Sequence, residues 1–521
     1  MKRLLAIILA SAAITAAQAG EQTALFRTAG GAVQGTTADN VSTFLGIPYA
    51  APPVGDLRWR PPQPAAAWQG TRQATAFGGT CAQPQRGVFA APSNTEDCLY
   101  LNVYTPDKTT ATRAKRPVMV WFHGGGLFSG ESNDYDGSKL VKRGGVVVVT
   151  INYRVGALGF FSHPAINGEG HPAINYGIMD QQSALKWVKA NIAAFGGDPS
   201  NVTIFGQSGG GTAVMANMQS PLSKGLFNKA INESGVRIGV TSPEFARKLG
   251  EDFATSAGCT DQSATCLRAL SVEQVLKNQG GIVSKVVDFP SVDGTVITKS
   301  ALAAYQAGQY NAVPMITGLV KDEQAFFMPE LNSGKARTEE EYKKFAASYG
   351  AENADKLIAK YSIAEFGSPS LAEIAMAQGA KACVARLLDI TWAKRAPVYA
   401  YQFEDRTAPS YFKAMSYPMR AYHTAELQFL FPLFKGGQGT AHPLSAEQEK
   451  LSDMMVDYWT SFARTGNPNG GKSKPPQWKP YAAQQDNVQA LNLPAPKPTA
   501  GYGAANDCAM WDEILAHMDG R

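Results

Sequence analysis

The chain has 521 residues and 44% of them are hydrophobic, so it can bury a large core. Its net charge of +5 is the balance of 48 basic and 43 acidic residues without a dense basic block, which argues against a nucleic-acid-binding function. The sequence contains no linker, low-complexity tract or repeat that would divide it. We therefore expect residues 20–521 to form one large domain with insertions.

The first predicted element is a signal peptide, residues 1–19. Met1-Lys2-Arg3 precedes a mostly apolar stretch from Leu4 to Ile14, and small residues follow up to Ala17-Gln18-Ala19. The apolar run is shorter than the roughly 20 residues that a membrane anchor needs, and it ends in an A-x-A cleavage pattern. We therefore expect cleavage after Ala19 and export to the periplasm or the medium. No other segment is long and apolar enough to predict a membrane span.

Six cysteines in an exported chain favour disulfides. They are Cys81, Cys98, Cys259, Cys266, Cys383 and Cys508. The first two and the next two are close in sequence, which suggests two local loops and leaves the last two to pair with each other. A zinc site is the alternative, but no pair has the C-x-x-C spacing that is typical of one.

Short runs rich in β-branched residues predict strands that are buried on both faces of a parallel sheet. These runs are 117–122, 146–151, 202–205, 230–232, 314–317 and 398–403. Helical patterns lie between them, for example at 181–188, and the alternation predicts an α/β fold. Two longer regions of mostly helical composition, 242–309 and 335–385, are expected to be insertions that cap the ends of the strands.

After the strand at 117–122 comes His123-Gly124-Gly125-Gly126, which is placed as an oxyanion loop would be. The backbone amides of Gly125 and Gly126, with that of Gly209, would then point at the negative charge that develops during acyl transfer. The alternatives are a flexible turn or a phosphate loop. No Lys-Ser/Thr pair follows the glycines, which argues against the phosphate loop. We interpret His123 as a structural residue of this loop.

The segment around Ser208 has the pattern of a nucleophile elbow. A strand-like run at 201–205 leads into Gly206-Gln207-Ser208-Gly209-Gly210, and a helix-compatible run at 212–218 follows. A sharp turn from strand to helix strains the serine backbone and crowds the positions two before and two after it, where only glycine fits. The pattern predicts that Ser208 is a nucleophile.

A serine hydroxyl needs a base and an orienting carboxylate to become a good nucleophile. His423 follows a predicted strand and its loop, in the chain order serine, acid, histidine that is typical of α/β-hydrolases. Glu323 and its neighbour Asp322 both follow the predicted strand 314–317, and spacing alone does not decide between them. The alternative is a solvated loop position for either carboxylate and a structural role for His423.

Further motifs extend the pattern over nearly the whole chain. They are FLGIPYA at Phe44–Ala50, EDCLYLNV at Glu96–Val103, NYRVG at Asn152–Gly156 and FGGDP at Phe195–Pro199. With the elbow, they make the chain resemble the type-B carboxylesterase family, α/β-hydrolases that include cholinesterases, para-nitrobenzyl esterases and the non-catalytic neuroligins. We expect the bacterial para-nitrobenzyl-esterase-like members to be the nearest relatives.

The resemblance implies an α/β-hydrolase fold and a serine esterase, which the predicted signal peptide would make a secreted enzyme. This chemistry needs no metal and no cofactor. The resemblance implies Ser208 as nucleophile, Glu323 as acid and His423 as base, and so favours Glu323 over Asp322. It also implies disulfides 81–98, 259–266 and 383–508, and a structural ion pair between Arg154 and Asp180. The expected substrate is a small-molecule ester. The alternatives are hydrolysis of amides, carbamates or thioesters, or an adhesion protein on the same fold, although such proteins have lost a member of the triad.

Two residues of the elbow depart from the family's usual Gly-Glu-Ser-Ala-Gly: Gln207 replaces the glutamate and Gly209 replaces the alanine. Gly209 keeps its backbone amide. Gln207 removes a negative charge near His423, which makes an imidazolium there less favourable. We therefore expect activity to persist to lower pH than in relatives with the glutamate.

Two segments concern the substrate. The loop from Ala82 to Asp97 lacks the tryptophan with which cholinesterases bind quaternary ammonium, so choline esters are not expected as substrates. The segment Gly281–Phe289, which by resemblance contributes to the acyl pocket, has Phe289 as its one aromatic residue. An acyl pocket open to larger groups is expected.

Overall fold

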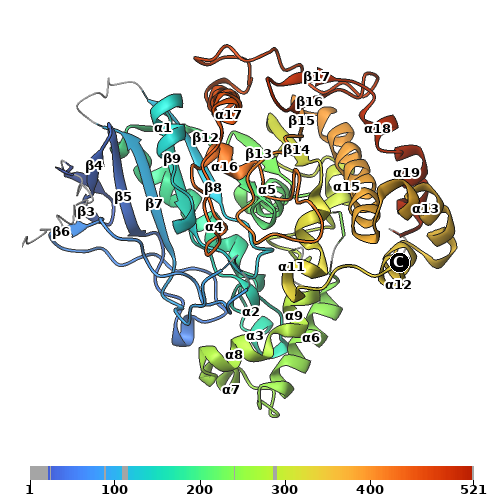
Figure 1. The fold of residues 1–521 in the computed structure, drawn as a ribbon. Helices are drawn as coiled ribbons and strands as arrows, with labels where there is room; N and C mark the ends of the chain where they lie inside the picture. The colour runs from blue at the N-terminus through green and yellow to red at the C-terminus, as the bar shows by residue number, and fades with distance from the viewer. Residues whose placement is uncertain are drawn as a thin grey trace, which may run out of the picture.

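The computed structural model describes residues 21–518 except 24, 87, 89, 108–114, 237, 240 and 286–289. The proposed signal peptide at 1–19 and Phe289 therefore lie outside the described residues. Within them, a twelve-stranded sheet runs through the molecule in the order β1-β4-β5-β7-β9-β8-β12-β13-β14-β15-β16-β17 (Figure 1).

The centre of this sheet is parallel, from β9 to β16. Its strands are β8 (Arg116–Phe122), β9 (Val147–Ile151), β12 (Gly197–Gln207), β13 (Lys229–Glu233), β14 (Met315–Val320), β15 (Val398–Phe403) and β16 (Val488–Leu491). Antiparallel strands extend both edges: β1 (Glu21–Gln22), β4 (Thr36–Ala38), β5 (Val41–Pro48) and β7 (Tyr100–Pro106) on one side, β17 (Lys497–Thr499) on the other. The predicted parallel strands are thus confirmed.

Helices cover both faces of the sheet, which explains why the central strands are continuously apolar. Along β8, Val118 and Val120 belong to one buried cluster, while Met119 and Trp121 belong to another. The first cluster includes residues of α4 (Tyr176–Asn191), α5 (Gly209–Gln219) and α10 (Ala301–Gln306). The second includes residues of α1 (Ser138–Gly144), α16 (Leu427–Leu430) and α17 (Ala446–Thr465). Alternate side chains of β8 are therefore buried in two different hydrophobic clusters, one on each face of the sheet.

The two predicted helical insertions are present. The first contains α6 (Pro243–Ser256), α7 (Ala264–Ala269), α8 (Val272–Asn278), α9 (Gly280–Lys285) and α10, and the first four form the lower lobe in Figure 1. The second contains α12 (Glu339–Ala347), α13 (Ala354–Lys360), α14 (Ile363–Phe366) and the long α15 (Pro369–Ala393), preceded by α11 (Pro329–Ser333). Capping boxes at Ser271 and Thr338 start α8 and α12, as their S/T-x-x-Q/E sequences favour.

Short elements complete the described part. A small sheet joins β2 (Phe26–Thr28), β3 (Gly31–Gln34) and β6 (Thr71–Gln73), and β10 (Phe160–Phe161) pairs with β11 (Ile174–Asn175). The remaining short helices are α2 (Gly156–Gly159), α3 (Pro164–Asn167) and α18 (Tyr502–Ala505), followed by α19 (Cys508–Met518). No helix among the described residues combines the length and apolar character needed to cross a bilayer.

Three disulfides join the pairs that the resemblance implied. Cys81 is bonded to Cys98, and Cys259, which follows α6, is bonded to Cys266 in α7. Cys383 in α15 is bonded to Cys508 at the start of α19. The last bond closes the longest loop and attaches the C-terminal helix to the second insertion.

Candidate active site

Ser208 stands between the end of β12 and the start of α5, as the elbow pattern predicts. Its backbone has φ 58° and ψ −122°, a conformation that non-glycine residues adopt only when the surroundings enforce it. The Ser208 amide donates a hydrogen bond to the Glu233 carbonyl (2.8 Å), and the Thr212 amide donates one to the Ser208 carbonyl (2.9 Å). These bonds to β13 and α5 hold the strained turn.

The flanking glycines of the elbow have no room for a side chain. A Cβ added at Gly210 would lie 1.9 Å from the carbonyl oxygen of Phe122, and one at Gly206 would lie 2.6 Å from the carbonyl carbon of Gly210. Both distances are far below van der Waals contact. The close approach of β8, β12 and α5 is therefore the physical reason for these glycines.

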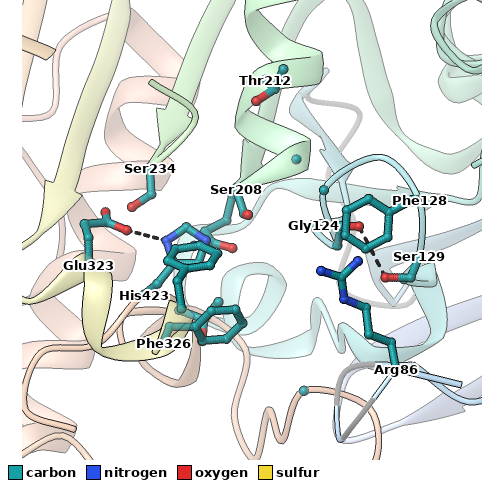
Figure 2. Close-up of a pocket in the computed structure, with 18 of the residues that line it drawn as sticks. Arg86, Gly124, Phe128, Ser129, Ser208, Thr212, Ser234, Glu323, Phe326 and His423 are labelled. Carbon is teal, nitrogen blue, oxygen red and sulfur yellow. Dashed lines mark hydrogen bonds and ion pairs between the residues drawn. The ribbon is translucent and has the colours of Figure 1, made fainter. Parts of the chain in front are cut away.

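His423 and Glu323 are hydrogen-bonded to each other through His423 Nδ1 and Glu323 Oε2 (Figure 2). Glu323 begins the turn after β14, and His423 lies in the loop between β15 and α16. The other carboxylate oxygen of Glu323 accepts a hydrogen bond from the Val320 amide (3.1 Å). Both side chains are buried, so the pair is fixed in orientation.

The electrostatics of this pair favour an ionised Glu323. Burial alone would raise its pKa, but the opposing effects of His423, Lys381 and Ser234 outweigh it, and the pKa lies below its ordinary value. Lys381 comes from α15, and its ammonium lies 4.5 Å from the centre of the Phe327 ring. A carboxylate that stays charged at neutral pH can hold the Nδ1 proton of His423 and leave Nε2 to act as a base.

Asp322, the other candidate for the acid, has a different partner. Arg406 donates two hydrogen bonds to its carboxylate, from Nε (2.8 Å) and Nη2 (2.7 Å). The Ala421 amide also donates to Asp322 Oδ2 (3.2 Å). The two neighbouring carboxylates thus have different partners: Asp322 pairs with Arg406, and Glu323 is hydrogen-bonded to His423.

The Nε2 atom of His423 faces the turn that contains Gln207 and Ser208. The side-chain amide nitrogen of Gln207 lies 3.3 Å from His423 Nε2, and it donates to that atom when Nδ1 carries the proton shared with Glu323. Ser208 lies beside the same ring in Figure 2. The structure therefore brings the predicted nucleophile, base and acid into one cavity.

The glycine loop after β8 packs directly against the elbow. A Cβ added at Gly209 would lie 2.7 Å from the Gly126 amide nitrogen and 2.8 Å from that of Leu127. Gly125 and Gly126 have φ of +99° and +65°, where a side chain would be strained. Gly125, Gly126 and Gly209 all line the cavity that contains Ser208. The three predicted oxyanion residues are thus together.

His123 packs beside the glycine loop and is not among the residues that line the cavity. Its ring stacks on Tyr153 with centroids 4.2 Å apart, and Nδ1 forms a hydrogen bond with the Gly124 carbonyl (2.8 Å). Burial lowers the pKa of His123 to about 4, so the ring is neutral in the working range. These contacts agree with the structural role predicted for it.

The cavity has a volume of about 510 Å³ and is lined by both polar and apolar side chains. Residues that the sequence reasoning missed contribute much of its wall: Arg86, Phe128, Asp134, Phe326, Phe327 and Lys381. Their sequence signals are weak. Arg86 lies within the loop closed by Cys81 and Cys98, and the two adjacent phenylalanines come three residues after Glu323. The size and the aromatic content suit a small organic substrate.

Comparison with known proteins assigns the chain to a family. The carboxylesterase family matches residues 22–511. The chain belongs to the carboxylesterase family. Similar proteins include human cocaine esterase, which is 37% identical over 93% of this chain and 89% of its own length. Duck medium-chain fatty acyl-CoA hydrolase precursor is 36% identical over 83% and 81%, and mouse carboxylesterase 1C is 34% identical over 91% and 89%.

This carboxylesterase is accordingly a carboxylic-ester hydrolase with the α/β-hydrolase fold. Its structure has the large, mostly parallel central sheet and flanking helices of that fold. In the part of the chain that the structure describes, no group of three or more histidine, cysteine, aspartate or glutamate side chains could hold a metal ion. The buried pair Arg154 and Asp180, joined at 2.8 and 2.7 Å, lies outside the cavity lining, which agrees with a structural role.

Two further carboxyl groups of the carboxylesterase, those of Glu233 and Glu426, are buried. Burial raises the pKa of Glu233 to about 8, although Trp459 Nε1 donates a hydrogen bond to Glu233 Oε1 (2.8 Å). Burial raises the pKa of Glu426 well above its ordinary value, and the neighbouring Glu233 and Glu323 raise it further. Burial therefore disfavours the charged form of both groups.

Proposed function

We propose that this carboxylesterase hydrolyses small-molecule carboxylic esters through an acyl-enzyme on Ser208. His423 Nε2 takes the proton of the Ser208 hydroxyl as that oxygen attacks the ester carbonyl, and Glu323 holds the imidazole and stabilises the imidazolium. The observation that carries this proposal is the buried hydrogen bond from His423 Nδ1 to Glu323, with the opposite ring nitrogen facing the elbow.

The attack converts the carbonyl oxygen into an oxyanion, which the backbone amides of Gly125, Gly126 and Gly209 stabilise. When the tetrahedral intermediate collapses, the alcohol leaves with the proton from His423 and the acyl group stays on Ser208. Water then attacks the acyl-enzyme with the same base, and the acid is released. The support for this assignment is that the three glycines line one cavity with Ser208 and lie against each other.

Hydrolysis of p-nitrophenyl acetate, butyrate and octanoate by the purified protein tests the proposal. Ser208→Ala should lower kcat by about 10⁴-fold or more, whereas Ser256→Ala, at an exposed position of α6, should leave it unchanged. Glu323→Gln should lower kcat by about 10³-fold or more, and Asp322→Asn by much less, because Asp322 pairs with Arg406. Full activity of Ser208→Ala would exclude the assigned nucleophile.

Thioester hydrolysis is a second candidate activity. The same chemistry cleaves thioesters, and one of the similar proteins is named a fatty acyl-CoA hydrolase. Release of free thiol from butyryl-CoA, measured beside p-nitrophenyl butyrate, tests it. A kcat/KM for the thioester that is lost in Ser208→Ala would support one site for both reactions.

We also propose that residues 1–19 are removed on export and that residues 20–521 form one domain. Three disulfides support an oxidising compartment, because such bonds are rare in the reducing cytosol. The mass and N-terminal sequence of the protein recovered from the periplasm or medium test the cleavage after Ala19. A product that still begins at Met1 would contradict it.

A further inference from the structure

The hydrogen-bond partner of His423 Nε2 among the described residues is Gln207. The two side-chain nitrogens lie 3.3 Å apart, and both side chains are buried. Because Nδ1 is bonded to Glu323, the tautomer with a proton on Nδ1 leaves Nε2 as an acceptor with one lone pair in the plane of the ring. The Gln207 amide therefore occupies the atom that acts as the base in the proposed mechanism.

Ser208 does not occupy this position. Within the described part of the chain, no hydrogen bond joins the Ser208 hydroxyl to His423, and Figure 2 shows a dashed line from His423 to Glu323 but none to Ser208. A serine becomes a good nucleophile when its proton passes to the base, so the hydroxyl must donate to the same lone pair. Gln207 and Ser208 are thus competing donors to one acceptor.

The other end of the Gln207 amide is loosely held. Its carbonyl oxygen lies beside Gly124, where an added Cβ would be 3.4 Å from it, and no described residue donates a hydrogen bond to that oxygen. Gln207 also lines the cavity, so its amide has space to turn into when it leaves His423. The exchange of donors therefore breaks no further hydrogen bond of this side chain to a described residue.

The competition depends on glutamine at position 207. An ionised carboxylate has no hydrogen to donate, so a glutamate here could accept from an imidazolium but could not donate to a neutral imidazole. The amide nitrogen of glutamine does the reverse, because it donates to the neutral ring and occupies its lone pair. The residue at position 207 thus determines whether the lone pair of Nε2 is open to Ser208.

We propose that Gln207 is a positioning residue that holds His423 Nε2 in the resting enzyme and gives it up to Ser208 at the start of each turnover. The inference rests on the proposed function, because it concerns the base that activates Ser208. The exchange replaces one hydrogen bond between neutral groups by another, so the two arrangements are close in free energy and both are populated. Ser208 is reactive in only one of them. The amide therefore lowers the reactivity of the resting enzyme.

The first test measures the reactivity of Ser208 at pH 8. Diethyl 4-nitrophenyl phosphate phosphorylates an activated serine and releases 4-nitrophenolate, so its second-order rate constant reports how often Ser208 has the base. Gln207→Met has a similar size and no N–H group. In this variant the rate constant, and kcat/KM for p-nitrophenyl butyrate, should both rise about fivefold, which corresponds to one such hydrogen bond. The control Gln484→Met, at an exposed position, should change neither.

A rise distinguishes a positioning role from a structural one, because a disturbed elbow would lower both rate constants. The acid limb of the pH–rate profile should stay within about 0.3 pH units of the wild type, since Ser208 then donates to Nε2 in place of the amide. Thermal unfolding checks that the variant is folded. Rate constants equal to or below those of the wild type in folded Gln207→Met would overturn the proposal.

The second test identifies the donor directly. In protein labelled with ¹⁵N-histidine, the His423 Nε2 resonance is assigned by its absence from His423→Ala, and it moves to higher frequency when Nε2 loses a hydrogen bond. Ser208→Ala should leave it in place, whereas Gln207→Met/Ser208→Ala should move it, because both donors are then absent. A shift in Ser208→Ala as large as that in the double variant would show that Ser208 is the resting donor and would contradict the proposal.

These outcomes are distinct from a failure of the proposed function. Equal rate constants in wild type and Gln207→Met, together with an inactive Ser208→Ala, would count against the exchange of donors and leave the serine mechanism intact. Full activity of Ser208→Ala, or no hydrolysis of p-nitrophenyl butyrate by the folded wild type, would instead count against the proposed function.

Discussion

Gln207 stands next to Ser208, the proposed nucleophile, at a position where the family usually has a glutamate, and its amide lies 3.3 Å from His423 Nε2. Gln207→Glu would place a carboxylate against this ring nitrogen and stabilise the imidazolium. Because the proposed mechanism requires a neutral His423 to accept the proton of Ser208, the acid limb of the pH–rate profile should move to higher pH by about 1 unit. The measurement is kcat/KM for p-nitrophenyl butyrate between pH 4 and 9.

Gln207→Met is the matched control, because it also removes the amide but adds no charge. Its acid limb should stay within about 0.3 pH units of the wild type, since the expected shift is electrostatic. If Gln207→Glu shows no upward shift, the carboxylate does not act on His423 and the hypothesis is wrong.

Gly209, the other unusual residue of the elbow, permits a closer approach of the oxyanion loop than a larger residue would. The methyl group of Gly209→Ala would lie 2.7 Å from the Gly126 amide nitrogen, so the loop must move away from Ser208. Loss of one oxyanion donor costs about 10²–10³-fold in kcat, and a displaced donor should cost about tenfold. The readout is kcat for p-nitrophenyl acetate, with KM little changed.

Gly239→Ala is the control for this change, because an added Cβ there meets nothing within 4 Å. It should leave kcat unchanged. An unimpaired Gly209→Ala would mean that the loop adapts to the methyl group without moving its amides out of line.

At the residue scale, the sequence predicted the grouping of Ser208, Glu323 and His423, because chain order and strand context restrict the candidates. It could not separate Glu323 from Asp322 without the resemblance, since adjacent residues share the same spacing from β14. It also missed Arg86 and Lys381. These two reach the cavity from a disulfide-closed loop and from α15, and only the packing of distant elements brings them to Ser208.

Among the secondary-structure elements, α15 and α19 depend on each other through the disulfide Cys383–Cys508. This bond spans 125 residues, whereas Cys259–Cys266 spans 7. In the chain-entropy model the stabilisation by a disulfide grows with the logarithm of the length of the loop that it closes. The Cys383–Cys508 bond should therefore stabilise the folded state by about 2.5 kcal/mol more than the Cys259–Cys266 bond. The double variant Cys383→Ser/Cys508→Ser should therefore lose more stability than Cys259→Ser/Cys266→Ser.

Urea unfolding followed by tryptophan fluorescence measures both losses. Trp511 is a suitable reporter because it is buried in α19 and packs with Tyr361 and Tyr349. Equal losses in the two double variants would show that the reduced chain keeps α19 docked and that loop length does not set the contribution.

The central strands could be predicted from the sequence because both of their faces are buried, which makes them continuous apolar runs. The expected strand 398–403 coincides with β15, and 117–122 nearly coincides with β8. The edge strands were not predicted. β1 and β17 have two and three residues with mostly exposed side chains, and a run so short shows neither alternation nor an apolar signal. Their pairing depends on the neighbouring strand rather than on their own sequence.

For the molecule as a whole, carboxyl groups buried between the sheet and its helices link stability to pH. Glu233 at the end of β13, Glu426 before α16 and Asp389 in α15 all have raised pKa values, with burial as the largest cause. Glu323 is the exception, because His423 and Lys381 lower its pKa. Burial thus raises the pKa of these three acids, whereas the charged neighbours of Glu323 lower its pKa.

Glu233→Gln tests the consequence for stability. Glu233 has a pKa of about 8 in the folded protein and near 4.5 when unfolded, so between these values the folded state binds more protons and stability falls as pH rises. By pH 8 the free energy of unfolding should have fallen by on the order of 4 kcal/mol.

Glutamine at position 233 removes this titration, and its side-chain carbonyl can still accept a hydrogen bond from Trp459. The Tm of Glu233→Gln relative to wild type should therefore rise from pH 5 to pH 8, while the exposed control Glu365→Gln should show no such trend. Parallel curves for Glu233→Gln and wild type would mean that Glu233 is solvated or paired when it ionises.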